Sequence, residues 1–285
     1  MTSPRVLLKA WGLEAKKQLG QHFLCDPAMA DKIIEEAGID PADVVLEIGA
    51  GLGALTLPAA RKAARVVAVD LDPNLLSLLK NELLSAGLDN VKLIKKNILS
   101  FDIAGFGRCQ SRRLIVIGNL PYNISSQVLI QLIQARGSVR HAVLMFQKEL
   151  ARRITAGPGP KAYGRLSVML AYCADIRKVA TAEAALFFPR PKVDSEVLKI
   201  SFRDHPLPGT ARETFFFATV KAAFGRRRKT LKNALSGSGL ALTAVQAHRA
   251  LQAAGIDPVR RAETLTVEEF VTLSRALAEV MGHPV

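Results

Sequence analysis

Cysteine is scarce in this chain of 285 residues, which has only Cys25, Cys109 and Cys173, all far apart. An odd and scattered set excludes the disulfide framework of a small secreted protein and the paired spacing of a zinc site. The chain also has no apolar run of bilayer length, and its first residues lack the apolar core of a secretory signal. These absences predict a cytoplasmic protein without a metal site or a membrane span.

Acidic residues are in the minority, and this imbalance indicates a polyanionic partner. The chain has 25 Asp and Glu against 39 Lys and Arg, which gives a formal net charge of +14. Such a charge favours nucleic acid, because neutralising phosphates releases their counterions. An anionic membrane surface is the competing interpretation, but no lipid-anchor signal accompanies the charge.

Short apolar runs alternate with helical patterns over most of the chain, and this alternation predicts an α/β fold with a mostly parallel sheet. A Pro/Gly-rich stretch, His205–Gly209, predicts the break before a second, all-helical domain. The runs typical of buried strands are Val44–Ile48, Arg65–Val69, Val91–Ile94, Leu114–Ile117 and Ala142–Met145.

A glycine-rich turn, Gly49-Ala50-Gly51-Leu52-Gly53, follows the first of these strands and precedes a helix. Glycines let the backbone approach a ligand closely, and a helix start offers free N–H groups. Asp70 ends the next strand, where a carboxylate receives ribose hydroxyls. The pattern Gly49-x-Gly51-x-x-Ala54 also satisfies the dinucleotide fingerprint, whereas Glu47 just before it suits S-adenosylmethionine. These residues alone leave both cofactors open.

The stretch Asn119-Leu120-Pro121-Tyr122 follows the run Leu114–Ile117, at the strand end where an open α/β sheet binds ligands. Asn119 offers an amide acceptor, Leu120 a carbonyl held by the following proline, and Tyr122 a face for a planar base. An ordinary turn after a strand is the alternative. Asn97, just past the strand Val91–Ile94, lies near the expected position of an adenine ring.

Two further segments are candidates for walls of the same pocket. Lys16–Leu24 is a basic, glycine-hinged segment, which is either a lid over the cofactor or a solvated arm. Phe187 precedes Pro189 and Pro191, which hold the chain extended. Its ring is therefore either a rigid second wall for a planar substrate or a residue of the buried core.

Clustered cations predict an RNA-binding surface. A run of charge usually forms a solvated face, but the excess of positive charge over the whole chain favours contacts with phosphate. The candidate RNA-binding residues are Lys16, Lys17, Arg190, Lys192, Arg226, Arg227, Arg228, Lys229 and Lys232.

Five motifs carry a resemblance to a known family: KQLGQHFL (17–24), EIGAG (47–51), NLPYNIS (119–125), PRPKVDS (189–195) and RRKTLKN (227–233). With them, nearly the whole chain resembles the ribosomal RNA adenine N6-dimethyltransferases of the KsgA/Dim1 family. The resemblance implies a Rossmann-like class I S-adenosylmethionine-dependent methyltransferase sheet with a small all-helical C-terminal domain. It also implies methylation of N6 of two adjacent adenosines near the 3′ end of small-subunit (16S) rRNA, late in subunit assembly.

The resemblance implies site residues and boundaries as well. His22 stands where the family has Asn, Asp70 where it has Glu, and Asn97 where it has Asp; these departures bear on cofactor affinity. We expect a basic arm or lid at 1–26, a methyltransferase domain at 27–204 and a helical RNA-binding domain at 210–285, in a monomer that acts on the pre-30S particle. With the two motif residues Glu47 and Gly51, the cofactor positions fall on His22, Leu24, Glu47, Gly49, Gly51, Asp70, Asn97 and Asn119.

The expected mechanism is direct in-line methyl transfer without a covalent enzyme intermediate, because a sulfonium already activates the methyl group. Acceptors draw the hydrogens of the amine out of the ring plane, and aromatic rings stack on a base splayed from its stack. Three alternatives stay open: a large-subunit rRNA methyltransferase of the macrolide-resistance type, a non-catalytic assembly factor, and, least favoured, a dehydrogenase. The expected catalytic residues are Asn119, Leu120, Pro121, Tyr122 and Phe187.

Overall fold

The computed structural model describes residues 3–204 and 212–282, and the chain divides into two compact units. One unit comprises Met1–Ala151 and Ile176–Phe202, and the other Arg152–Asp175 and Arg203–Val285. The predicted break at His205–Gly209 lies outside the described residues. The methyltransferase domain predicted from the sequence, 27–204, includes residues 152–175. In the structure, this segment belongs to the same unit as the C-terminal helices. The predicted domain limits themselves stay a prediction.

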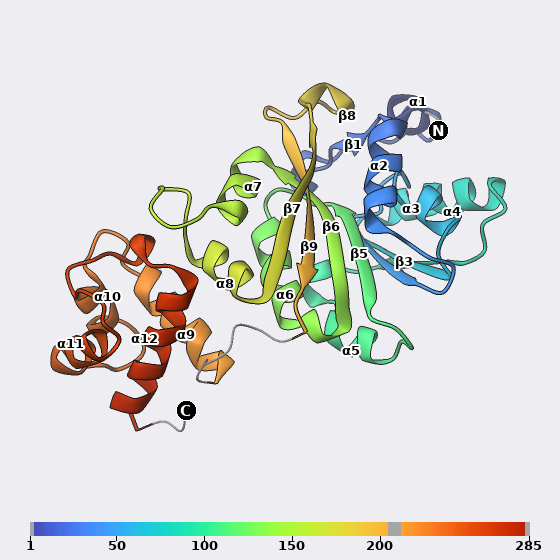
Figure 1. Cartoon of the computed structure of the whole chain (residues 1–285). Helices are drawn as coiled ribbons and strands as arrows, with labels where there is room; N and C mark the ends of the chain where they lie inside the picture. Colours follow the sequence, from blue (N-terminus) through green and yellow to red (C-terminus); the bar gives the residue numbers. More distant parts are fainter. Residues whose placement is uncertain (1–2, 205–211, 283–285) are drawn as a thin grey trace. The chain divides into compact units, whose positions relative to one another are not determined.

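The framework of the first unit is a seven-stranded sheet, which in spatial order consists of β4 (Val91–Lys95), β3 (Arg65–Asp70), β2 (Val44–Ile48), β5 (Leu114–Asn119), β6 (Val139–Gln147), β9 (Ser195–Phe202) and β7 (Ala174–Ala182) (Figure 1). The pairs from β4 to β6 are parallel, and β9 runs antiparallel to β6. The α/β fold predicted from the alternation is confirmed.

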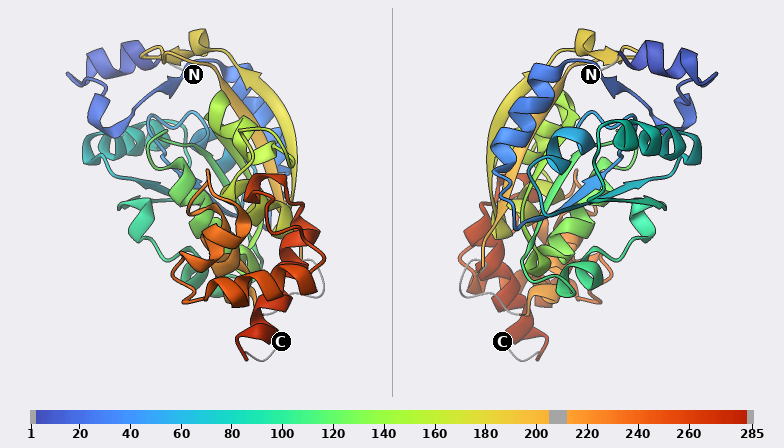
Figure 2. Two further views of the ribbon diagram at one scale, coloured as in Figure 1. Left: turned by 90° about the vertical axis from the view of Figure 1, so that its left-hand side faces the viewer. Right: turned by 90° about the vertical axis from the view of Figure 1, so that its right-hand side faces the viewer.

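Helices cover both faces of this sheet, with α2 over one face and α6 over the other (Figures 1 and 2). Parallel strands need such crossover helices, which bury both faces of the sheet. The helices of the first unit are α2 (Pro27–Ala37), α3 (Thr56–Ala60), α4 (Pro73–Ser85), α5 (Ile103–Arg108) and α6 (Ser125–Gln134), and the boundary between the two units falls within α7 (Lys148–Thr155).

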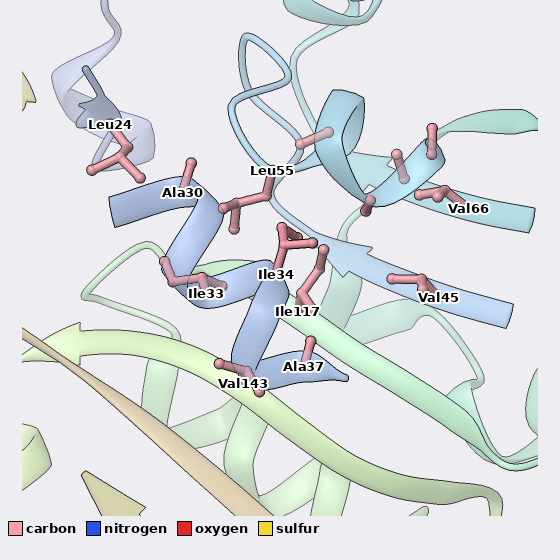
Figure 3. Packing of buried hydrophobic residues seen from close by; sticks show 14 of the residues in the cluster. Leu24, Ala30, Ile33, Ile34, Ala37, Val45, Leu55, Val66, Ile117 and Val143 are labelled. Atoms are coloured by element: carbon pink, nitrogen blue, oxygen red, sulfur yellow. The ribbon is translucent and has the colours of Figure 1, made fainter. Parts of the chain in front are cut away.

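Helix α2 shows how the local sequence and the packing agree. The side chain of Asp26 accepts a hydrogen bond from the N–H of Ala28 at 3.1 Å, and Pro27 starts the helix at a position where its missing N–H costs nothing. The apolar face of α2 packs on the strands whose carboxyl ends carry the predicted site. The core cluster in Figure 3 includes Ile33, Ile34, Ala37, Val45, Ile117 and Val143.

A two-stranded ribbon joins the N-terminal arm to a segment far along the chain. β1 (Phe23–Leu24) pairs antiparallel with β8 (Phe187–Phe188). Helix α1 (Pro4–Ala10) belongs to the same region, because its Leu7 packs with Phe23 in one apolar cluster. Figure 2 shows the dark blue N-terminal segment beside the gold segment around β8.

The second unit is helical, as predicted, and consists of α8 (Arg165–Cys173), α9 (Glu213–Phe224), α10 (Leu231–Ser236), α11 (Ala244–Ala253) and α12 (Val267–Val280). Aromatic contacts hold its core: Tyr172 stacks on Phe216 with ring centroids 4.3 Å apart. The basic run 225–229 lies in the turn between α9 and α10. Within the described ranges, no helix of either unit is long and apolar enough to cross a membrane.

Candidate active site

A cavity of about 260 Å³ lies at the carboxyl ends of β2, β3 and β5, the edge at which an open α/β sheet binds ligands. The arm, the glycine-rich loop and the Asn-Leu-Pro-Tyr stretch meet in its wall. All the predicted cofactor residues line it, as do all the predicted catalytic residues except Phe187, so that its wall includes His22, Leu24, Glu47, Gly49, Gly51, Asp70, Asn97, Asn119, Leu120, Pro121 and Tyr122.

The glycine-rich loop needs glycine for both its conformation and its neighbours. Gly49 and Gly51 have φ of 78° and 53°, which L side chains rarely adopt. A Cβ atom at Gly49 would lie 3.4 Å from the Asn119 carbonyl oxygen, and one at Gly51 would lie 3.3 Å from the Phe23 ring. The carboxylate of Asp70, at the end of β3, accepts the N–H of Gly51 at 2.8 Å and so holds the loop in place. The loop is therefore close-packed between the arm, β3 and the end of β5.

One buried carboxyl group, Glu47, and one half-buried carboxyl group, Asp70, give the cavity its electrostatic character. Burial raises the pKa of Glu47 to about 8, although a hydrogen bond from Thr56 acts in the opposite direction. Burial also raises the pKa of Asp70. Neither carboxyl group forms an ion pair with any described residue. The cavity therefore favours a ligand that brings positive charge or hydroxyl donors, and it disfavours the pyrophosphate of a dinucleotide.

The arm is attached to the sheet at Asp72, the N-cap of α4. Lys16 Nζ lies 2.8 Å from the Asp72 carboxylate, and Gln21 Nε2 donates to it at 3.1 Å. Burial alone would raise the pKa of Asp72, but these donors hold it below its ordinary value. Asp72 is 2% exposed, so the arm buries this carboxylate while residues 18–24 form part of the cavity wall. Residues of the arm thus belong to the cavity wall, and their role as a lid over a cofactor stays a prediction.

Two hydrogen bonds and one ring contact hold the side chains of the Asn-Leu-Pro-Tyr stretch in place. Asn119 Nδ2 donates to the His22 carbonyl oxygen at 2.8 Å, which directs its amide oxygen elsewhere. The Tyr122 hydroxyl lies 3.0 Å from Ser195 Oγ on β9. The Tyr122 ring stacks on His22, with centroids 5.6 Å apart and planes inclined by 25°. Distant segments of the chain thus fix the orientation of both functional side chains.

Phe187 differs from the other predicted catalytic residues. Its side chain is 4% exposed and lies in the core cluster with Leu24 and Val197, and it does not line the cavity. Successive residues of a strand point to opposite faces, so Phe188 instead packs beside the arm in the cluster that contains Phe23. Of the two interpretations of Phe187, the core position is the one observed.

The predicted RNA-binding cations fall into two groups. Lys16 is bound to Asp72, and Arg227 is bound to Glu263 and to the Tyr163 carbonyl within the second unit. These two therefore have structural partners inside the protein. The second group consists of Lys232, which is half-buried, and of six exposed cations: Lys17, Arg190, Lys192, Arg226, Arg228 and Lys229.

Some residues of the cavity wall were not predicted. Pro4 and Leu7 of α1 line it, and so do Leu71 and Lys96 at the ends of neighbouring strands. The position of Leu71 directly after Asp70 was a usable signal, whereas nothing in the sequence of α1 indicated a ligand. Within the described part of the chain, no cluster of His, Cys, Asp and Glu has a metal-binding geometry.

The mixed sheet, with an antiparallel β9 beside β6 and a glycine-rich loop after β2, defines the class I S-adenosylmethionine-dependent methyltransferase fold. A family model described as ribosomal RNA adenine dimethylase matches residues 12–279. The chain therefore belongs to the ribosomal RNA adenine dimethylase family.

Similar proteins agree with this assignment. The ribosomal RNA small subunit methyltransferase A of Desulforapulum autotrophicum is 50% identical over 282 residues, which are 99% of each chain. A dimethyladenosine transferase from Plasmodium falciparum has a solved structure with a TM-score of 0.77 and 26% identity, covering 91% of this chain and 98% of that chain. The 23S rRNA methyltransferase ErmE has a TM-score of 0.68 at 26% identity, covering 90% and 99%.

Proposed function

We propose that this protein transfers methyl groups from S-adenosylmethionine to N6 of two adjacent adenosines near the 3′ end of small-subunit (16S) rRNA, which gives N6,N6-dimethyladenosine. Family membership and the 50% identical small-subunit methyltransferase support the reaction and its substrate. The observation that carries the proposal is the fixed amide of Asn119 at the cavity wall.

The orientation of Asn119 suits an amine substrate. Its nitrogen is occupied by the His22 carbonyl, so its oxygen is left to accept a hydrogen from a ligand in the cavity. The Leu120 carbonyl supplies a second acceptor at the same edge. Two acceptors draw the hydrogens of the adenine amine out of the ring plane and leave its lone pair available for attack. After each transfer the methylated amine carries a positive charge and releases one proton to solvent, so no general base is assigned.

The cavity fits S-adenosylmethionine, which supplies a methyl group activated by its positively charged sulfur. The unpaired carboxyl groups of Glu47 and Asp70 suit a cationic ligand with ribose hydroxyls, and the loop at Gly49 and Gly51 admits close approach. His22, Leu24 and Asn119 complete that side of the wall. We assign Asn97, which lines the same cavity, to the adenine of the cofactor; its Oδ1 already accepts the N–H of Leu99 at 3.0 Å.

The fit has a direct test at Glu47. Because its pKa is about 8 in the ligand-free protein, Glu47 is mostly protonated at pH 7. A cationic ligand lowers that pKa, so binding of S-adenosylmethionine releases close to one proton. Calorimetry in two buffers of different ionisation enthalpy measures this release, and Glu47→Gln removes it. If S-adenosylmethionine bound equally well without releasing a proton, Glu47 would not interact with the bound cofactor.

The target base stacks on Tyr122 after it leaves its own stack, as for other enzymes that act on bases. Tyr122 lines the cavity, whereas Phe187 lies in the core cluster with Leu24 of β1, so we assign the stacking on the base to Tyr122. Exposed cations such as Lys17, Arg190 and Arg228 contact the RNA backbone. A pre-30S particle is the partner, and the enzyme acts on it in the cytoplasm as a monomer.

The deciding experiment measures transfer of labelled methyl groups from S-adenosylmethionine to small subunits that lack the modification, beside naked rRNA and large subunits. Labelling of small subunits, mapped to N6,N6-dimethyladenosine, is the expected result. Labelling of large subunits alone would instead favour a 23S rRNA methyltransferase, which is the activity that the name of ErmE gives. An RNA complex that forms without any labelling would favour a binding factor.

A further inference from the structure

We infer that His22 is a positioning residue for the target-base wall: its imidazole sets the plane of Tyr122 and leaves a single face of that ring for the base. This inference rests on the proposed function, because it concerns the substrate half of the same cavity. It adds a role to the one that we propose for His22 in the wall of the cofactor cavity.

The ribbon brings His22 to this position. In the antiparallel register of β1 and β8, Phe23 lies opposite Phe188 and Leu24 lies opposite Phe187. His22 directly precedes β1, and Pro189 directly follows β8. The Cys25 N–H donates to the Leu186 carbonyl oxygen, so by the alternation of an antiparallel ladder His22 and Pro189 form a non-hydrogen-bonded pair, whose backbones make no bond to each other. The imidazole of His22 links this pair instead, with Nδ1 2.7 Å from the Pro189 carbonyl oxygen.

That contact fixes the tautomer of the ring. A carbonyl oxygen only accepts, so Nδ1 carries the hydrogen and donates it to Pro189. With Nδ1 anchored on the ribbon, the ring plane of His22 is set by the β1–β8 pair. The His22 backbone carbonyl meanwhile accepts the amide N–H of Asn119. The residue thus contacts Asn119 through its backbone and Tyr122 through its side chain.

Tyr122 is clamped by this arrangement. One face of its ring meets His22 at 5.6 Å between centroids, a separation at which two rings are already in contact, so no base fits between them. Its hydroxyl is held by Ser195, which is fully buried on β9. The base therefore takes the face of Tyr122 turned away from His22, and the arm must be in place for that wall to be rigid.

Two matched variants separate the ring of His22 from its hydrogen bond. His22→Asn keeps a donor for Pro189 but loses the ring, and His22→Phe keeps a ring for Tyr122 but loses the donor. Both keep the backbone carbonyl that holds Asn119. For each full-length variant we would measure the dissociation constant of S-adenosylmethionine and the single-turnover rate of methyl transfer to small subunits at saturating cofactor.

A second readout needs no activity. The chain has three tyrosines, and Tyr163 and Tyr172 are buried in the second unit. Protein labelled with 3-fluorotyrosine therefore gives three fluorine NMR signals, of which Tyr122→Phe identifies one. His22→Asn should move the Tyr122 signal, while the signals of Tyr163 and Tyr172 stay in place and report intact folding.

The expected result is a rate at saturating cofactor about 2- to 10-fold lower in His22→Asn than in His22→Phe. Because His22 also lines the cofactor cavity, the dissociation constant of each variant sets the cofactor concentration needed for saturation. An unmoved Tyr122 signal would overturn the inference. So would equal saturated rates in the two variants, since the ring of His22 would then have no effect on the target-base wall. If the wild-type protein methylates nothing, the proposed function fails, whereas the NMR measurement still decides the role of His22.

Discussion

The two ends of strand β2 carry buried acidic residues that the protein treats in opposite ways. Asp43, directly before the strand, is fully buried and lies 2.9 Å from Arg140 and 3.6 Å from Arg112. Glu47, near the other end, is 1% exposed, has no ion pair among the described residues and accepts only from Thr56. A buried charge is tolerated when it is paired, and an unpaired acid is neutralised instead. The charge of Asp43 is therefore compensated by arginines of the protein itself, whereas Glu47 has no such partner and is available to a ligand.

The largest effect is expected at the ligand end, where Asn119→Ala removes the amide acceptor. By analogy with the loss of one preorganised hydrogen-bonding group in other enzymes, turnover should fall about 100- to 1000-fold. RNA affinity and the free energy of unfolding should change little, because the bond to His22 is a single one. Methyl incorporation per bound complex is the measurement, with exposed Asn81→Ala as control. Normal turnover with lost RNA binding would contradict the role of Asn119.

The paired end should respond in stability rather than in activity. Arg140→Ala leaves Asp43 buried with only the more distant Arg112, and we expect the free energy of unfolding to fall by about 2 kcal/mol. Arg140 is partly exposed, so the full cost of an orphaned buried charge is not expected. Urea unfolding and turnover per folded molecule are to be compared. A variant of normal stability that lost activity would mean that the two ends are not functionally distinct.

The pH dependence of stability sharpens the contrast. The folded protein keeps a proton on Glu47, with a pKa of about 8, that the unfolded chain releases near its ordinary value. Stability of the ligand-free protein should therefore fall as the pH rises from about 5 to about 8, by at most about 1.4 kcal/mol per pH unit for this group. Glu47→Gln should flatten the slope measured by urea unfolding, and Glu35→Gln on the exposed face of α2 should not. Identical slopes for all three proteins would mean that Glu47 is ionised.

The smallest effect concerns the cations of the second unit, and it depends on the same distinction between paired and unpaired charge. Neutralising Arg228 and Lys229 should lower the slope of log affinity for RNA against log salt by about 0.7 to 0.9 for each phosphate that the protein no longer neutralises. Arg227→Ala should leave that slope nearly unchanged, because Arg227 is bound to Glu263. Titrations of small-subunit rRNA at several salt concentrations test both variants. Equal slopes in wild type and in the double variant would assign the run to an ordinary solvated face.

The predictable part of this molecule was local. Apolar runs located β2, β3 and β5 to within a residue or two, and the residues just past their ends proved to line one cavity. What sequence could not supply were pairings between distant segments. The β1–β8 register turns Phe187 into the core, and the bonds to Asp72 and Glu263 engage Lys16 and Arg227. A short strand or a single cation has the same local pattern in either environment, so only the packing decides.

The attachment of the arm at Asp72 has a kinetic consequence. Asp72 joins the arm to the sheet through its carboxylate, and its own N–H donates to Asp70 at 2.9 Å, which in turn holds the loop at Gly51. Residues 18–24 form part of the cavity wall, so breaking these bonds would loosen the wall beside a bound ligand. We therefore expect the residence time of a ligand to depend on opening of the arm. Lys16 is 46% exposed, so salt should shorten that time by screening its pair with Asp72.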